Sequence, residues 1–411
     1  MSKTLNRWYL VLMLICLFAF PNMCTSFNIN YRYIQGLCII LSSFIIICNK
    51  RKIHLVPLIL LITFILLYSV FKLYTDHSEG IKASLIQILG APIIFAALYK
   101  TTINRIIPDS NLKLWQSFYR FLLYFFICVA GIAIIELLIG RPILGWLPDD
   151  TTIYITTEEI SNFRSCSLLG HPLYNALCIS IIMSFVLCSP LKNKYKYLLW
   201  LFGYIAILCF NTRSSIVGHL LLLSIYIFYN IFWGKQINIK NKVLTLFIFT
   251  IIIFSIIFLI NTIGIGGRLI ELGLFDEDSA QTRIDIWTIF NFTDIKDILF
   301  GINSDQFSLL LYQSGLFVTE NYWIDQLFRF GIVFMIPYIL FYIAFCKKIY
   351  KGYGIFRSMF TCMTFILISS TNNSLSTNYL AIVIFLLCII IFHPKNFYRL
   401  IPKKYINIYL I

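Results

Sequence analysis

The chain has 411 residues, of which 59% are hydrophobic and 12% are charged, whereas soluble domains have roughly 45–50% and about 25%. This composition excludes a water-soluble fold. The mean hydropathy is +0.84, and apolar runs recur along the whole chain, each long enough for a crossing of about 20 residues. We therefore predict an all-α polytopic membrane protein, with a single integral membrane domain over residues 1–411.

Uncharged apolar stretches bounded by charged or turn residues predict about 12 transmembrane helices. They cover residues 8–27, 33–48, 55–71, 83–99, 118–139, 172–189, 197–210, 214–233, 243–263, 322–346, 356–370 and 377–392. The seventh and the last two are short for a bilayer core of about 30 Å. Lys3 and Arg7 before the first stretch also resemble a signal sequence, but no small-residue cleavage site follows, so we expect an uncleaved span.

The net charge of +15 is explained by membrane topology. One alternating set of connections holds 23 of the 33 Lys and Arg residues but, of the 18 acidic residues, only Asp109. Because cytoplasmic loops retain Lys and Arg, this set is assigned to the cytoplasm, and both termini with it. The excess charge therefore predicts no nucleic-acid partner.

Two connections on the opposite, extracytoplasmic side are long. They cover residues 140–171 and 264–321, and long connections in compact proteins are usually functional. The sequence has no phosphate-binding glycine loop with lysine, no HExxH and no GxSxG, which argues against an ATP-driven pump and common hydrolases. We expect no metal and no cofactor, and a disulfide between Cys24 and Cys166 stays an open alternative.

Arginines on the outer side lie in a stretch without acidic residues, since no Asp or Glu occurs between Glu159 and Glu271. Arg164 precedes a predicted span, and Arg213 lies in the turn Asn-Thr-Arg-Ser-Ser between two spans. An arginine at the membrane surface is costly without an anion, and its planar guanidinium suits phosphate. A lipid-borne diphosphate would fit, although the alternative is that these side chains reach phospholipid head groups.

Two further outer residues could take part in proton transfer. His171 stands before Pro172 at the start of a span, where it acts either as a catalyst or as a helix-end donor. Glu136, near the outer end of the fifth span, is a secondary candidate.

The second long loop holds the other candidates. Arg283 opens an apolar stretch that could lie on the membrane surface. Glu320 has no helical partner and is the better candidate for a general base. Asn321, Asp325 and Arg329 are secondary candidates, and Asp325 and Arg329, four residues apart, could simply pair with each other.

Four motifs together resemble the O-antigen polymerase and ligase superfamily, whose polymerases are called Wzy. They are Arg164 through Leu-Gly-His171-Pro, the Asn-Thr-Arg213-Ser-Ser turn, Arg283 with Trp287 followed by Ile-Leu-Phe-Gly301-Ile-Asn, and Glu320-Asn321-Tyr before Gly331-Ile. The resemblance covers roughly residues 118–346. It implies a GT-C-like membrane glycosyltransferase that uses undecaprenyl-diphosphate-linked oligosaccharides on the outer face of the bacterial cytoplasmic (inner) membrane.

Carried over to this chain, the resemblance implies that Arg213 and Arg283 hold the donor diphosphate. Arg164 and His171 would shape the same cavity, and Glu320 would deprotonate the acceptor hydroxyl. The family also implies membrane lipids and a chain-length regulator as partners.

The resemblance favours an O-antigen or surface polysaccharide polymerase over a ligase. Ligases of the superfamily place a histidine near the end of the second long loop, where this chain has Glu320 and Asn321. A flippase or another transporter of lipid-linked oligosaccharide is the remaining alternative. The sequence shows no pair of Gly- or Pro-broken helices in matching halves, as many carriers have.

Overall fold

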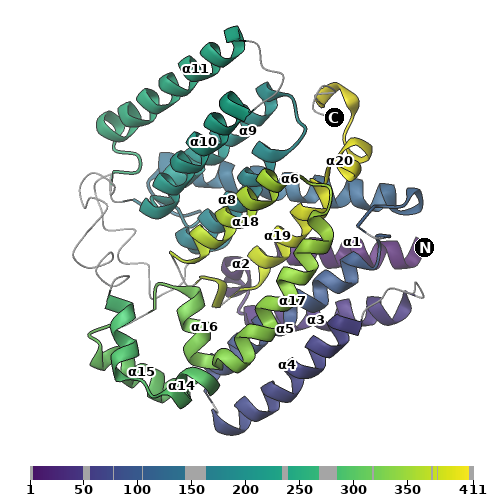
Figure 1. Cartoon of the computed structure of the whole chain (residues 1–411), viewed down its shortest axis with the longest axis vertical. Helices are drawn as coiled ribbons and strands as arrows, with labels where there is room; N and C mark the ends of the chain where they lie inside the picture. The colour runs from purple at the N-terminus through teal and green to yellow at the C-terminus, as the bar shows by residue number, and fades with distance from the viewer. Residues whose placement is uncertain are drawn as a thin grey trace.

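The computed structural model describes residues 3–49, 56–76, 78–103, 105–143, 163–233, 239–267, 285–316, 319–371, 374–376 and 378–406. These ranges form helices and no strand (Figure 1). The longer helices are α1 (Lys3–Phe18), α3 (Tyr31–Cys48), α4 (Val56–Thr75), α5 (Glu79–Tyr99), α6 (Leu112–Ile139), α8 (Pro172–Cys188), α9 (Asn193–Phe210), α10 (Arg213–Trp233), α11 (Ile239–Phe258), α17 (Ile332–Tyr350), α18 (Ile355–Ser369) and α19 (Leu380–Ile391). The short ones are α2 (Pro21–Ser26), η1 (Asp109–Asn111), η3 (Leu259–Ile263), η4 (Ile286–Phe292), α14 (Ile295–Phe300), α15 (Ser304–Gln313), α16 (Tyr322–Phe330), η5 (Ser374–Ser376), α20 (Pro394–Leu400) and η6 (Lys403–Tyr405).

The chain is an all-α membrane protein. Four helices in the described ranges are long and apolar enough to cross a membrane: Tyr31–Cys48, Asp109–Ile139, Arg213–Trp233 and Ile332–Tyr350. A fifth is added if Leu380–Ile391 and Pro394–Leu400, which meet at 82°, form one broken span. Each of the twelve apolar stretches of the sequence contains one helix or a broken pair of helices.

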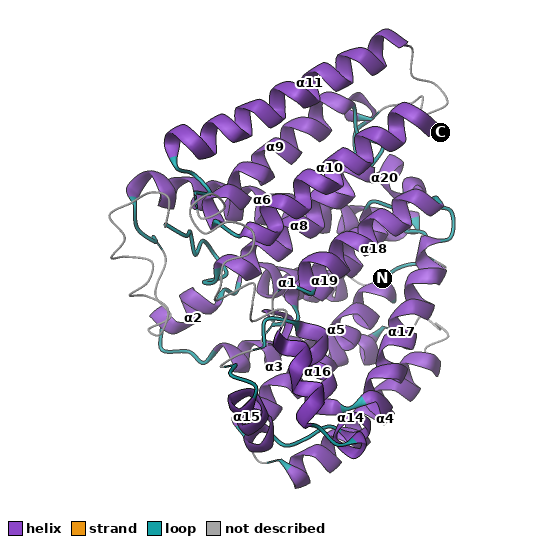
Figure 2. Cartoon of the chain, turned by 60° about the vertical axis from the view of Figure 1, so that its left-hand side comes forward, coloured by secondary structure: helices purple, strands orange, loops and turns teal. Residues whose placement is uncertain are grey.

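Helices α8 and α19 form the centre of the bundle. Every residue of α19 is buried, and so is nearly every residue of α8. Both are apolar on all sides, which is the pattern of a helix surrounded by other helices. Helix α8 contacts α9, α10, α18 and α19, whereas α11 and α4 lie at opposite edges of the molecule (Figures 1 and 2). A central helix of 12 residues spans only about 18 Å, which a membrane protein tolerates where protein covers the helix ends.

Two of the twelve stretches are interrupted by residues that end a helix. The first is divided into α1 and α2 before Pro21, because proline has no N–H to continue the hydrogen-bond ladder. The tenth is divided into α16 and α17 at Gly331, whose φ of 75° and ψ of 165° are adopted almost only by glycine. The bend at Gly331 separates α16 from the membrane-crossing part of the stretch.

Helices α14, α15 and α16, together with η4, form a layer near one end of α4 (Figure 2). Gly301 and Gly331 cross there at backbone distance, and a Cβ on Gly301 would stand 2.7 Å from the carbonyl oxygen of Arg329. The Ile302 amide donates to the Phe328 carbonyl at 2.8 Å. We call α14, α15, α16 and η4 the outer layer. It has a small apolar core of its own, which includes Phe307 and Phe328.

Polar contacts hold the outer layer against α4. The Tyr68 hydroxyl lies within hydrogen-bonding distance of the Phe300 and Phe330 carbonyl oxygens. Asp76 accepts hydrogen bonds from the Ser304 amide at 2.8 Å and from the Ser78 amide at 2.9 Å. Burial alone raises the pKa of the Asp76 carboxyl, but the hydrogen bonds from Ser78 and Ser304 outweigh it and lower the pKa. Asp76 therefore stays ionised while it joins the end of α4 to the outer layer.

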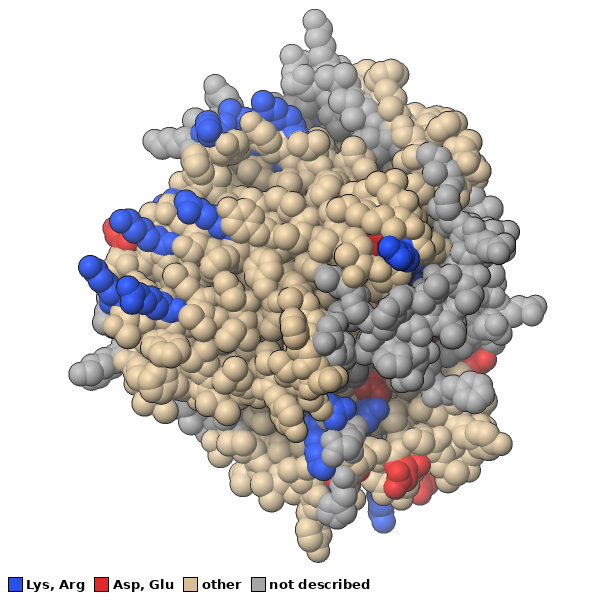
Figure 3. All heavy atoms as spheres, turned by 180° about the vertical axis from the view of Figure 1, so that it is seen from behind, with Lys and Arg blue, Asp and Glu red and all other residues tan. Residues whose placement is uncertain are grey.

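Charged side chains are distributed unevenly over the surface. Seen from behind, one group of basic side chains lies along the left edge and upper left and another at the lower centre, and most of the acidic side chains in view lie toward the lower right (Figure 3). The edge with the basic side chains is the side on which both ends of the chain lie in Figure 1. We call it the basic end.

We predict that Gly331→Ala lowers the free energy of unfolding by about 3 kcal/mol or more. Any Cβ there meets the Leu299 carbonyl group and requires a positive φ that alanine adopts at a cost of about 1–3 kcal/mol. The measurement is the thermal unfolding of the detergent-solubilised protein. Gly131→Ala is the matched control, because Gly131 lies in α6 with no neighbour within 4 Å, and this variant should be at least as stable as the unchanged protein. Equal melting temperatures for the two variants would contradict the packing argument.

Candidate functional site

Arg164 and Arg213 are brought together by contacts between the segment before α8 and the turn before α10. The Ser165 amide donates to the Cys209 carbonyl at 3.0 Å, and the Asn211 side-chain amide donates to the Phe163 carbonyl at 3.1 Å. The Arg164 Nε lies 3.5 Å from the Phe210 carbonyl oxygen. The residues on both sides of Arg164 are therefore fixed to the turn that carries Arg213.

The turn consists of Asn211 and Thr212 and is tight, as the sequence predicts, but it is one residue shorter than the predicted gap because Arg213 already belongs to α10. Asn211 has φ 51° and ψ 45°, a left-handed conformation that asparagine tolerates better than most residues. Arg213 is the first residue of α10 and is 8% exposed. The first amides of an α-helix have no partner within the helix, and a helix N-terminus attracts anions.

Glu136, on α6, holds the segment around Arg164 in place. It is completely buried at the end of α6. Its carboxylate accepts a hydrogen bond from the Ser165 hydroxyl, one from the Ser167 amide at 2.8 Å and one from the Ile143 amide at 3.0 Å. These contacts give Glu136 a positioning role beside Arg164. They also occupy the carboxylate oxygens with which a general base would accept a proton.

His171 occupies the N-cap position of α8, and Pro172 is the first helical residue, as predicted. The His171 carbonyl accepts hydrogen bonds from the Asn175 amide at 3.1 Å and from its side chain at 3.0 Å. Asn175 also donates to the Cys166 carbonyl. Buried Asn175 therefore fixes the turn that connects Arg164 to His171.

The start of α16 places the second group of candidates. Asn321 is an N-cap residue, since its side chain accepts hydrogen bonds from the Trp323 and Ile324 amides at 3.0 and 3.3 Å. Glu320 directly precedes it and is half-buried. Helices α16 and α8 both contact η5, so η5 connects the region of Glu320 with the helix that His171 opens.

Asp325 and Arg329 pair with each other. The Arg329 Nε lies 3.0 and 3.1 Å from the two Asp325 carboxylate oxygens. Asp325 also accepts a hydrogen bond from the Thr319 hydroxyl at 3.1 Å, and the Arg329 guanidinium lies over the Phe307 ring. Both side chains stabilise α16 and its packing.

Arg283 lies outside the described residues. Within the described ranges, no group of three His, Cys, Asp or Glu residues is close enough to hold a metal ion. Cys24 and Cys166 are both free thiols.

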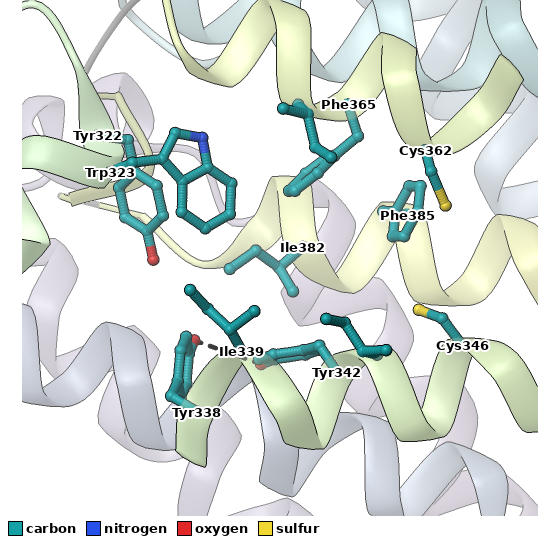
Figure 4. A pocket seen from close by; sticks show the side chains of 12 residues that line it. Tyr322, Trp323, Tyr338, Ile339, Tyr342, Cys346, Cys362, Phe365, Ile382 and Phe385 are labelled. Atoms are coloured by element: carbon teal, nitrogen blue, oxygen red, sulfur yellow. Dashed lines mark hydrogen bonds between the residues drawn. The ribbon is translucent and has the colours of Figure 1, made fainter. Parts of the chain in front are cut away.

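An apolar groove lies next to the start of α16 (Figure 4). It has a volume of about 220 Å³ and runs between α17 on one side and α18 and α19 on the other. Its lining residues are Tyr322, Trp323, Tyr338, Ile339, Tyr342, Ile343, Cys346, Cys362, Phe365, Ile366, Ile382 and Phe385. Ile343 and Ile366 are exposed on the side of the bundle, so the groove opens sideways. The Trp323 indole N–H, in contrast, is buried and has no hydrogen-bond partner among the described residues.

Three residues of the site escaped sequence reasoning: Ser165, Asn175 and Asn211. Each forms its contacts with a segment that is distant in the sequence or in a loop, so no local pattern reveals its role. Asn211 had a usable signal, because an asparagine between two helices is typical of a left-handed turn.

No family model matches the sequence, and no curated protein is significantly similar to it.

We predict that Glu136→Gln loosens the segment of Arg164. A hydrogen bond to a charged group contributes about 1.5–3 kcal/mol, so Cys166 should react with a water-soluble maleimide at least about tenfold faster. Peptide-resolved mass spectrometry measures the labelling rate, with buried Cys178 of α8 as the internal control. An unchanged rate at Cys166 would mean that Glu136 does not hold this segment.

Proposed function

We propose that this protein is a polysaccharide polymerase of the bacterial inner membrane. It would transfer a growing glycan from undecaprenyl diphosphate to the next lipid-linked repeat unit on the outer face. The observation that supports this best is the junction of Arg164 with Arg213 at the start of α10.

The junction has the chemistry of a diphosphate site. Arg213 is the first residue of α10 and Arg164 contacts the residue before the turn, and the charge and amide donors of a helix N-terminus favour a phosphate oxygen. The Thr212 hydroxyl is buried and has no hydrogen-bond partner among the described residues, so it can donate to such an oxygen. Arg283 is proposed to complete the site.

The reaction requires a base and a stabilised leaving group. The acceptor hydroxyl oxygen forms the new bond to the anomeric carbon while that carbon loses its bond to the diphosphate. Glu320 is proposed to take the hydroxyl proton, and the arginines stabilise the charge on the departing undecaprenyl diphosphate. His171 is proposed to line the same cavity.

The groove beside α16 supports a lipid-linked substrate. Its wall is almost entirely apolar, it opens sideways between α17 and α18, and it begins two residues after Glu320. An isoprenoid chain could lie in it while the diphosphate stays at the surface. The Trp323 N–H is then available to a polar group of the carrier.

The remaining topology is part of the same proposal. A GT-C-like arrangement of twelve spans with both termini in the cytoplasm agrees with the twelve helical stretches and with the gathering of Lys and Arg at the basic end. A chain-length regulator is the proposed protein partner.

Arg213→Ala should reduce polymerisation about 100-fold, because it removes one preorganised donor to the leaving group. The measurement is gel analysis of surface polysaccharide in cells whose only copy carries the substitution, and a single-repeat band is expected. Arg141→Ala is the control, since Arg141 is an exposed arginine that follows α6. Immunoblots of the membrane fraction confirm that both variants insert.

The same gels separate the alternatives. Unpolymerised repeat units on the cell surface support a polymerase, and a bare acceptor indicates a ligase or flippase. Repeat units retained inside indicate a flippase. Normal polymer length in both Arg213→Ala and Arg164→Ala would contradict the proposed diphosphate site.

Filling the groove should slow the reaction without unfolding the protein. Ile343→Trp places an indole in the groove, whereas Leu340→Trp, at a similarly exposed position of α17, does not line it (54% and 57% exposed). We expect turnover of a long-chain isoprenoid substrate to fall about tenfold in the first variant only, since about 1.4 kcal/mol of lost binding corresponds to that factor. Equal rates for the two variants would exclude the groove as the chain site.

A further inference from the structure

A second cluster of basic side chains lies away from the site described above, where α9 and α18 begin. Lys196 of α9 is 3% exposed and lies within electrostatic reach of Arg357 of α18. The ring of Tyr226, which contacts Lys196, lies 6.0 Å from that of Phe360, three residues after Arg357 on α18. The Lys196 ammonium lies 3.2 Å from the Tyr226 hydroxyl, which accepts one of its three donors. Cys188, at the end of α8, lies within electrostatic reach of both cations.

No Asp or Glu side chain of the described segments around this cluster neutralises these two charges. The sequence contains no Asp or Glu between Glu159 and Glu271, and Asp325 is the last acidic residue of the chain. Lys196 and Arg357 both belong to these acid-free stretches. Asp109, the acidic residue that the charge pattern assigns to this side, pairs with Arg399. Two like charges, one of them buried, are unfavourable unless an anion joins them or the buried group loses its proton.

Two more groups point to the same kind of ligand. The Tyr353 hydroxyl is buried, with the residue 2% exposed, and has no hydrogen-bond partner among the described residues. The Tyr353 ring lies 6.3 Å from that of Phe185, three residues before Cys188 on α8, and Tyr353 is within electrostatic reach of Arg357 and Cys188. Helix α18, with 15 residues, begins after Gly354 without a side-chain cap, so its first amides are available as donors.

We propose that Lys196, Arg357 and Tyr353 form an anion site that binds a phosphate group at the basic end of the protein. The phosphate belongs either to the head group of an anionic phospholipid or to free inorganic phosphate, and both present the same oxygens. Arg357 offers a planar set of donors, Lys196 a compact charge and Tyr353 a hydroxyl donor. This site is distinct from the Arg164–Arg213 junction and does not depend on the proposed transferase activity.

The burial of Lys196 distinguishes the proposed site from the ordinary contact of a surface lysine with lipid head groups. A lysine that merely reaches the membrane surface keeps its ammonium group in water, whereas Lys196 is enclosed. Lys192 and Lys194, on the same turn of α9, are exposed and have the ordinary arrangement.

The test compares the full-length protein in nanodiscs of phosphatidylcholine with and without phosphatidylglycerol. A parallel series in phosphatidylcholine uses inorganic phosphate against chloride at equal ionic strength. Thermal unfolding and native mass spectrometry of retained lipid are measured for the unchanged protein and for Lys196→Met, Arg357→Gln and Tyr353→Phe. Lys194→Gln is the matched control.

We expect phosphatidylglycerol or inorganic phosphate to raise the melting temperature of the unchanged protein and of Lys194→Gln. Each of the three site variants should bind it about tenfold more weakly, and Lys196→Arg should restore part of the affinity. If only phosphatidylglycerol stabilises the protein, the ligand is a lipid head group. If inorganic phosphate also stabilises it, the site binds the free anion as well.

A change in the stability of the variants with the opposite sign overturns the proposal. Without a bound anion, Lys196→Met removes a buried repulsion, so this variant would be more stable than the unchanged protein in every medium. Tyr353→Phe would then be neutral or stabilising, because it removes an unsatisfied hydroxyl. Either pattern, or equal ligand binding by Lys194→Gln and Lys196→Met, shows that no anion site exists there.

Discussion

The backbone contact between the segment of Arg164 and the turn before α10 determines the arrangement of the candidate site. Its hydrogen bonds join residues 163–165 to Cys209 and Asn211. An irregular segment within a membrane protein has few waters to satisfy its polar groups, so protein partners must do so. Glu136 and Asn175 complete this set from α6 and α8. The segment of Arg164 and the turn before Arg213 are thus fixed by buried hydrogen-bonding groups, among them the Glu136 carboxylate.

A second constraint holds the outer layer against the bundle. Gly301 and Gly331 let two backbones cross where any side chain would separate them. Because the chain turns sharply at Gly331, α16 lies in the outer layer while α17 enters the bundle. Asn321 caps α16 and the Asp325–Arg329 pair stabilises it. Glu320 is therefore held at the end of a rigid element next to the apolar groove, an arrangement that suits a substrate with one polar and one apolar end.

Acid-free stretches shape both ends of the protein. At one end they leave Arg164 and Arg213 in segments without a sequence-adjacent carboxylate, and at the other they leave Lys196 and Arg357 in the same situation. In a bilayer, a cation in such a segment meets phosphate more often than any other anion. The two clusters therefore point to phosphate chemistry by the same physical argument, although one is tied to the proposed reaction and the other is not.

The sequence by itself determined the all-α class, the twelve helical stretches and the presence of a tight turn before α10, because these depend on local hydropathy and on residues that start or end helices. It also gave Pro172 at the start of α8 and the pairing of Asp325 with Arg329, both of which follow from short spacing. Only the tertiary structure decided that Glu136 anchors the segment of Arg164, that Asn211 and Asn175 hold its two ends, and that the stretch 322–346 is broken at Gly331. The reason is that these features depend on contacts between residues up to about 50 positions apart, and on a backbone crossing, neither of which leaves a periodic pattern in the sequence.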